Sequence, residues 1–166
     1  MKLIVDSGST KTDWIAIDNS GNKLFETQTL GLNPQVLSEH ILEERVINNY
    51  EIYQSRKIVT ELFFYGAGCG TKPPEDLIKK VLKPIFQNAN IQIKEDTYAA
   101  IYSCCSPGEK AIVSILGTGS NCSYYDGEMV HQKITSLGYI LMDDASGNFF
   151  GRQLLRDCYF NKMPID

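Results

Sequence analysis

Short apolar runs separated by small polar residues open the chain, and this pattern predicts three β-strands. The runs cover residues 3–5, 12–17 and 23–29, and Ser, Thr, Asn and Gly fill much of the intervals between them. Such residues are typical of tight turns between neighbouring strands. The pattern therefore predicts three consecutive strands, the first of which ends at Asp6.

Helices and strands alternate after this segment. Apolar residues near helical spacing predict a helix from about 35 to 54, and a clearer amphipathic helix begins at Pro73-Pro74. Pro84 should bend or shorten this second helix. Further apolar runs predict strands at 62–65 and 91–93, and a small helix follows the last of them. The predicted order is βββαβαβα, which belongs to the α/β class.

The strand pattern then begins again, which indicates an internal repeat. Residues 111–138 form a strand, a Gly/Ser/Thr turn, a strand, an Asp-Gly turn, a strand and Leu-Gly, in the same order as residues 3–31. The repeat predicts two similar lobes facing each other across a cleft. We expect a complete first lobe, 1–109, and the beginning of a second, 110–166, with a helix from about 146 to 159. Either the chain is a fragment or the second lobe is severely reduced.

Composition and charge narrow the class of protein. The chain has 16 Lys and Arg against 20 Asp and Glu, which argues against a module that binds nucleic acid through its phosphates. Its apolar runs are too short for a membrane span or a signal peptide. The five cysteines form no C-x-x-C pair, so we expect free thiols. The sequence predicts a cytoplasmic protein with no nucleic-acid and no membrane partner.

The turn after the first strand carries candidate chemistry. It has the sequence Asp6-Ser7-Gly8-Ser9-Thr10-Lys11-Thr12. Glycine permits close approach of a ligand to the backbone, and successive N–H groups and hydroxyls can hold phosphate oxygens. Lys11 can add a cation, and a carboxylate such as that of Asp6 can hold Mg²⁺ through water. The alternative is a plain β-turn in which Asp6 is a local cap.

Two other glycine-rich segments follow strands. Gly117-Thr118-Gly119-Ser120 stands at the equivalent point of the repeat, and two such turns are harder to explain as plain hairpins than one. Neither turn matches G-x-x-x-x-G-K-[ST], which excludes that class of phosphate-binding loop. The run Gly66–Gly70 follows the apolar strand 62–65, and we interpret it as a bend from strand to loop.

Four motifs in this order resemble the BadF/BadG-type ATPase family, and within it the N-acetylglucosamine kinase branch of the actin-like ATPase and sugar kinase superfamily. They are Asp6–Thr12, Asp96, Gly117–Cys122 (GTGSNC) and Asp143–Gly147 (DDASG). The resemblance implies a ribonuclease H-like lobe, ATP and Mg²⁺ as cofactors, and phosphorylation of an amino sugar such as N-acetylglucosamine at its 6-hydroxyl. The amino sugar is then the small-molecule partner, and a homodimer is one possible assembly.

The resemblance also implies a role for each matched residue. Asp96 is the expected catalytic base. The residues expected at the ATP phosphates, with Asp6 also orienting Mg²⁺ through water, are Asp6, Gly8, Ser9, Thr10, Lys11, Thr12 and Gly117. The residues expected to hold the sugar are Asn33, Thr118, Gly119, Asn121 and Asp143. Family members are nearly twice as long, and their adenosine-binding segment has no counterpart here, so we expect weak nucleotide binding and weak turnover if the chain ends at Asp166.

Some of these roles have a structural alternative. Asn33 before Pro34 is also a good helix cap, Asp96 could merely cap the helix after it, and Asp143 could belong to a solvated turn. Two other classes of function also stay open. One is an ATPase activator that drives electron transfer to a dehydratase, which an iron–sulfur cluster would favour. The other is a non-catalytic sugar-binding module, which sugar binding without ATP consumption would favour.

Overall fold

The computed structural model of the protein describes residues 1–132 and 138–163. The chain divides into two compact units, residues 1–99 and 100–166. The division falls before the expected boundary after residue 109, because Ile101 is fully buried in a cluster with Val113 and Tyr125 of the second unit. Among the described residues, no helix is both long and apolar enough to cross a membrane.

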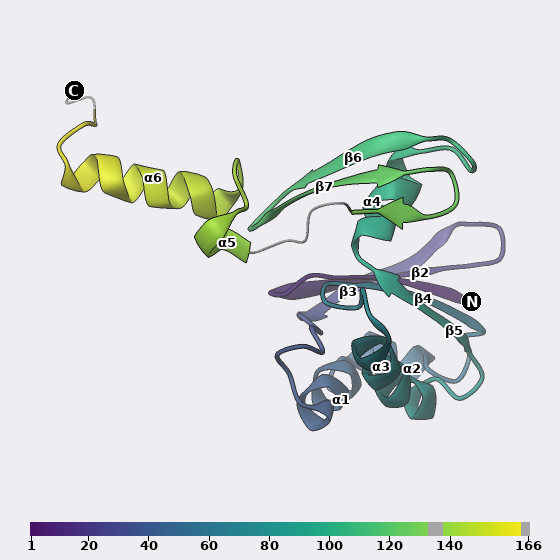
Figure 1. Cartoon of the computed structure of the whole chain (residues 1–166). Coiled ribbons are helices and arrows are strands. Elements are labelled where there is room, and N and C mark those ends of the chain that lie inside the picture. Colours follow the sequence, from purple (N-terminus) through teal and green to yellow (C-terminus); the bar gives the residue numbers. More distant parts are fainter. Residues whose placement is uncertain (133–137, 164–166) are drawn as a thin grey trace. The chain divides into compact units, whose positions relative to one another are not determined.

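The first unit is built on one five-stranded sheet with the order β3-β2-β1-β4-β5 (Figure 1). Its strands are β1 (Lys2–Ser7), β2 (Lys11–Ile17), β3 (Lys23–Leu30), β4 (Glu61–Gly66) and β5 (Asn90–Glu95). The first three strands pair antiparallel, whereas β1, β4 and β5 run parallel. The five predicted strands therefore share one sheet, and the carboxyl ends of β1, β4 and β5 lie at the same edge.

Three helices lie on one side of this sheet: α1 (Glu39–Ile47), α2 (Tyr50–Ser55) and α3 (Lys72–Ile85) (Figure 1). The single helix expected from about 35 to 54 is two helices, because Asn49 starts α2 by accepting a hydrogen bond from the Ile52 amide at 3.1 Å. The α3 helix ends one residue after Pro84, in line with the expected shortening.

The core of the first unit lies between the sheet and these helices. Its fully buried aromatic side chains include Trp14, Phe64 and Phe86, and the rings of Trp14 and Phe86 stack with their centroids 6.4 Å apart. Each such side chain contributes roughly 1.5–3 kcal/mol through the hydrophobic effect. The large apolar core fixes the positions of the strand ends at the edge that carries the candidate chemistry.

The second unit has a three-stranded antiparallel sheet with the order β6-β7-β8. Its elements are α4 (Thr97–Cys104), which begins in the first unit, β6 (Ala111–Leu116), β7 (Ser120–Tyr125), β8 (Val130–His131), α5 (Gly138–Leu141) and α6 (Gly147–Tyr159). The third strand of the repeat is β8, and residues 133–137, near the expected end of the repeat, lie outside the described residues. The short α5 was not expected, whereas α6 matches the expected last helix.

Candidate functional site

Buried hydroxyl groups at its two ends stabilise the turn after β1. The Gly8 amide donates to the Lys11 carbonyl at 3.0 Å and closes the turn. Beneath it, the Ser7 and Thr12 hydroxyls are 2.9 Å apart, and the Thr12 hydroxyl also donates to the Leu30 carbonyl at 3.2 Å. Thr12 was expected at the ATP phosphates, but it is buried, and its hydroxyl stabilises the fold through the bond to Leu30.

The exposed part of this turn presents groups that suit an anion. Ser9, Thr10 and Lys11 are exposed to solvent, and the backbone of Ser9 and Thr10 joins the two hydrogen-bonded strands β1 and β2. Hydroxyls and backbone N–H groups on a turn of fixed shape are the donors that phosphate oxygens accept from. The geometry therefore fits a phosphate at Ser9 and Thr10 more closely than at the buried Thr12.

Charges gather beside the turn on β1 and β2. Asp6 and Asp13 are cross-strand partners, and the Lys11 ammonium lies 2.8 Å from an Asp13 carboxylate oxygen. Although Asp6 is a largely exposed residue, partial burial of its carboxyl raises the pKa above the ordinary value of 3.8, and the charge of Asp13 raises it further. Lys11 offsets part of this effect on the pKa. A cation beside Asp6 would relieve the same repulsion, so this corner suits Mg²⁺ held by one carboxylate and water.

Asp96 lies directly after β5, at the same edge of the sheet as Asp6. It is half-buried, and its Oδ1 accepts a hydrogen bond from the Thr97 amide at 3.0 Å. Burial raises the pKa of this carboxyl, as do the neighbouring charges of Glu95 and Asp6, while the Thr97 hydrogen bond lowers it. A carboxylate with a raised pKa is a stronger base, and active sites commonly contain such groups. Asp96 thus supports the start of α4 and also carries the property that a general base needs.

The turn after β4, Gly66–Gly70, does more than bend the chain. The Asp96 amide donates to the Gly66 carbonyl at 3.3 Å, and a Cβ on Gly70 would lie 3.0 Å from the Glu95 carboxylate. Cys69 is buried here, and burial together with the charges of Asp96, Glu75 and Glu95 raises the pKa of its thiol to about 12. The turn is therefore a wall of the site beside Asp96. Three glycines at alternate positions were the sequence signal for such close packing.

Asn33 is not a helix cap in this fold. Helix α1 begins at Glu39 after Ser38, whereas the Asn33 carbonyl accepts from the amides of Val36 and Leu37 in a separate turn. The Asn33 Oδ1 accepts from the Gln35 amide at 2.9 Å. Asn33 is half-buried and lies against Gly68, so it belongs to the same edge of the unit as the turn after β4.

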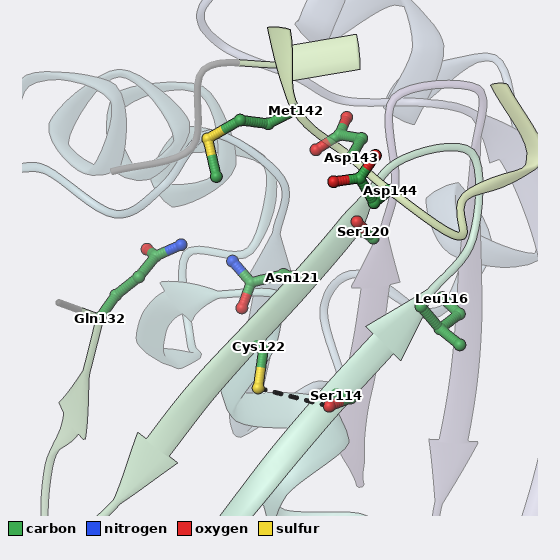
Figure 2. A pocket seen from close by; sticks show the side chains of 9 residues that line it. All are labelled: Ser114, Leu116, Ser120, Asn121, Cys122, Gln132, Met142, Asp143 and Asp144. Atoms are coloured by element: carbon green, nitrogen blue, oxygen red, sulfur yellow. Dashed lines mark hydrogen bonds between the residues drawn. The ribbon is translucent and has the colours of Figure 1, made fainter. Parts of the chain in front are cut away.

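The second unit carries its own pocket of about 270 Å³ (Figure 2). The side chains that line it are Ser114, Leu116, Ser120, Asn121, Cys122, Gln132, Met142, Asp143 and Asp144. Asn121 and Asp143 were expected to hold the sugar, and Figure 2 shows both with Gln132 and Met142 around the same space. Gln132 and Met142 had no signal in the sequence, because they come from segments outside the four motifs.

The loop before α6 packs on the Gly117 turn. Asp143 and Ala145 have φ values of 66° and 62°, a left-handed conformation that costs energy in residues other than glycine. A Cβ on Gly119 would lie 2.8 Å from the Asp143 Oδ2, so Gly119 makes room for this carboxylate. The Gly147 amide donates to the Gly117 carbonyl at 2.8 Å. Strained backbone held by such contacts is typical of functional sites.

Further contacts tie the same loop and turn together. The Asn148 side-chain amide donates to the Thr118 carbonyl at 2.8 Å, and the Ser146 hydroxyl caps α6 by accepting from the Phe149 amide at 3.1 Å. Four of the expected residues of this unit, Gly117, Thr118, Gly119 and Asp143, thus lie in one cluster. Among the described residues, no group of three or more His, Cys, Asp or Glu is arranged to hold a metal ion.

Comparisons with known proteins identify the fold. No family model and no curated protein matches the chain. A solved structure from Porphyromonas gingivalis, provisionally named an N-acetylglucosamine kinase, matches with 32% identity and a TM-score of 0.91, over 99% of this chain and 58% of its own. A second, from Chromobacterium violaceum and with the same provisional name, matches with 17% identity and a TM-score of 0.64, over 99% of this chain and 60% of its own.

A third solved structure has a different acceptor in its name. The inorganic polyphosphate/ATP-glucomannokinase of Arthrobacter sp. strain KM matches with 16% identity and a TM-score of 0.56, over 92% of this chain and 72% of its own. The chain has the mixed α/β fold of these sugar kinases, the actin-like ATPase fold expected from its sequence. It spans less than two thirds of the first two structures. The narrower resemblance to BadF/BadG-type ATPases stays a prediction.

Proposed function

We propose that this chain belongs to an ATP-dependent kinase that phosphorylates N-acetylglucosamine or a related amino sugar at its 6-hydroxyl. The observation that carries the proposal is the shared sheet edge of the first unit. It brings a supported, glycine-containing turn at Ser9 and Thr10 together with Asp96, a half-buried carboxylate of raised pKa. The likeness to the Porphyromonas gingivalis protein supports an amino sugar as the acceptor.

The first unit supplies the groups that phosphoryl transfer requires. Asp96 accepts the proton of the attacking hydroxyl, and its raised pKa suits that step. Ser9, Thr10 and the backbone amides of the turn hold the phosphates, and Lys11 exchanges its bond with Asp13 for one with a phosphate oxygen. Asp6 would hold Mg²⁺ through water. When bound, the ion would neutralise charge that develops on the phosphoryl oxygens.

The second unit contributes recognition in this proposal. Asn121 and Asp143 line the pocket of about 270 Å³ and offer an amide and a carboxylate to sugar hydroxyls. Thr118 and Gly119 lie beside them, and we assign them to the sugar as well, with Gly117 at a phosphate. We also assign Asn33 of the first unit to the sugar. The homodimer and the cytoplasmic location stay predictions.

The test is an ADP-release assay on the full-length protein with a panel of acceptors. The panel contains N-acetylglucosamine, glucosamine, N-acetylmannosamine, glucose and 6-deoxy-N-acetylglucosamine. We expect turnover with an amino sugar and none with the 6-deoxy compound. Asp96→Asn should lower kcat by about 10²–10⁴-fold with a much smaller change in sugar affinity, because it removes basicity and keeps the size.

The matched control is Asp76→Asn, which makes the same change at an exposed position of α3. A kcat of Asp96→Asn above about half the wild-type value would mean that Asp96 is only a support for α4. Sugar binding without ADP release from the wild type would instead indicate a non-catalytic sugar-binding module.

A further inference from the structure

The segment between β3 and α1 touches the turn after β1. The Gly31 amide donates to the Thr10 carbonyl at 2.9 Å, and the Leu32 amide donates to the Ser7 hydroxyl at 3.1 Å. A Cβ on Gly31 would lie 2.4 Å from the Ser9 carbonyl oxygen, so the two backbones are in direct contact. Arg45 also donates to the Gly31 carbonyl. This segment is therefore fixed to the turn that we assign to phosphate.

Two residues later, the same segment interlocks with the turn after β4. The Gln35 backbone amide donates to the Asn33 Oδ1 at 2.9 Å, and the Gln35 Nε2 donates to the Gly68 carbonyl at 3.2 Å. Gly68 has a φ of +80°, and a Cβ there would lie 2.7 Å from the Asn33 Oδ1 and 3.0 Å from the Gln35 Cγ. Gln35 thus binds both partners at once, Asn33 through its backbone and Gly68 through its side chain.

These contacts set the orientation of the Asn33 side chain. Because a backbone N–H requires an acceptor, the oxygen of the Asn33 amide faces Gln35, and the NH₂ group points the other way. That NH₂ is a donor suited to a sugar hydroxyl. Gly68 packs against the same oxygen, so its position, which the Gln35 side chain holds, confines the Asn33 amide from the other side.

The turn after β4 continues this chain of contacts to the proposed base. From Gly68, the turn runs through buried Cys69 to Gly70, which lies against the Glu95 carboxylate. At its other end, the Gly66 carbonyl accepts from the Asp96 amide. A contact that fixes Gly68 therefore also fixes the rest of the Gly66–Gly70 turn beside Asp96.

We propose that the Gln35 side chain is a positioning group for sugar binding: by holding Gly68 it keeps the Gly66–Gly70 turn packed against the Asn33 amide and beside Asp96. This inference rests on the proposed function. Gln35 is exposed, and it acts through Asn33 and Gly68 and not on the reacting atoms. Its loss should consequently weaken sugar binding more than it slows the chemical step.

The experiment compares Gln35→Met, which keeps the side-chain length and removes the donor, with Gln54→Met, a matched change at an exposed position of α2. In the full-length protein, Gln35→Met should raise the Kd and KM for the sugar about 2- to 10-fold, the size of one neutral hydrogen bond, with kcat changed less than 2-fold. Gln35→Lys, which restores a donor, should recover part of the affinity. Gln54→Met should behave as wild type.

Amide hydrogen exchange gives a readout that needs no activity. The Cys69 amide donates to the Gly66 carbonyl at 3.1 Å, so its exchange reports on the turn. Gln35→Met should speed exchange at Cys69 and leave the unfolding midpoint, followed by Trp14 fluorescence, unchanged.

Unchanged exchange at Cys69 would overturn the clamp whether or not the protein is a kinase. Faster exchange with wild-type sugar affinity would confine Gln35 to a structural role and overturn the proposal. Faster exchange in a protein that neither phosphorylates nor binds any sugar of the panel would refute the proposed function, and with it the role in the sugar site.

Discussion

The two units carry similar turns on very different scaffolds. In the first unit the Gly8 amide closes its turn at 3.0 Å to the Lys11 carbonyl, and in the second the Gly117 amide does so at 2.9 Å to the Gly119 carbonyl. Beneath the first turn lies a core drawn from four of the five strands and from α1, α2 and α3. Beneath the second, the buried apolar side chains are Ile101, Val113 and Tyr125 among the described residues.

The difference shows that the local sequence is enough to form the turn, whereas the size of the core packed beneath the turn does not follow from that local sequence. A glycine after an apolar strand produces the hairpin in both units, regardless of what is packed below. The second unit instead exposes large apolar side chains, including Ile112, Leu141, Phe150 and Tyr159, and α6 has no buried residue. Exposed apolar surface of this kind is typical of regions that other protein covers.

The largest effect on stability should come from comparing the same change, Phe→Ala, at one position in each unit. Phe64→Ala, at a fully buried position of β4, should lower the free energy of unfolding by about 3–5 kcal/mol through lost burial and a cavity. Phe150→Ala, at a position of α6 that is 60% exposed, should cost less than about 1 kcal/mol. Urea unfolding followed by fluorescence of Trp14, the single tryptophan, measures the first unit, and far-UV circular dichroism follows α6. Equal costs would remove the distinction between the scaffolds.

A second pair of substitutions compares the surroundings of the two turns. Gly31→Ala should destabilise the first unit by about 1–3 kcal/mol, because its Cβ would lie 2.4 Å from the Ser9 carbonyl oxygen and backbone must move. Gly117→Ala should change the free energy of unfolding by no more than about 0.5 kcal/mol, since no atom lies within 4 Å of its Cβ. Thermal unfolding of both variants measures the difference. A tolerated Gly31→Ala would show that the turn and the segment after β3 are not tightly coupled.

Much of the fold of the first unit could be predicted from the sequence. Apolar runs such as 62–65 have the length and composition of buried strands, and the Gly/Ser/Thr turns mark their ends. The break at Asn49 could not be predicted, because apolar spacing continues across it and a side-chain cap decides the boundary. Helix α5 could not be predicted either, because it is four residues long and too short to show helical periodicity.

The candidate site was predictable only where a motif carries it. Asp6, Asp96, Asn121 and Asp143 fall in motifs that resemble a known family. Gln35 showed no signal, because its importance comes from contacts with Asn33 and with Gly68, 33 residues away. Pairings of this kind depend on tertiary structure, which sequence spacing does not contain.

A third prediction concerns the apolar face of α6. Replacing Leu154 and Leu155, which are 56% and 62% exposed, by Gln keeps helix propensity and should change the free energy of unfolding by less than about 0.5 kcal/mol. Binding of a hydrophobic dye should fall, because apolar surface is removed. Leu82→Gln, at a buried position of α3, is the control and should unfold much of the first unit. A wild-type dimer that the double variant converts to monomer, seen by sedimentation, would mean that a second copy covers this face.

The smallest effect is electrostatic, and the two units should show it with opposite signs. In the first unit, burial and the charge of Glu95 raise the pKa of Asp96 above its ordinary value of 3.8. In the second, the Met129 amide, the His131 ring and the Glu128 amide all donate to the Asp126 carboxylate and lower its pKa below that value. A raised pKa means that the folded state binds the proton more tightly, so the contribution of Asp96 to stability falls as pH rises through its pKa. A lowered pKa means that the contribution of Asp126 is present above pH 3.8 and is lost as pH falls through its pKa.

Carboxyl chemical shifts in an NMR titration should therefore place the midpoint of Asp96 above 3.8 and that of Asp126 below it. Asp96→Asn and Asp126→Asn should remove these two opposing slopes from the pH dependence of stability, and midpoints on the same side of 3.8 would refute the contrast.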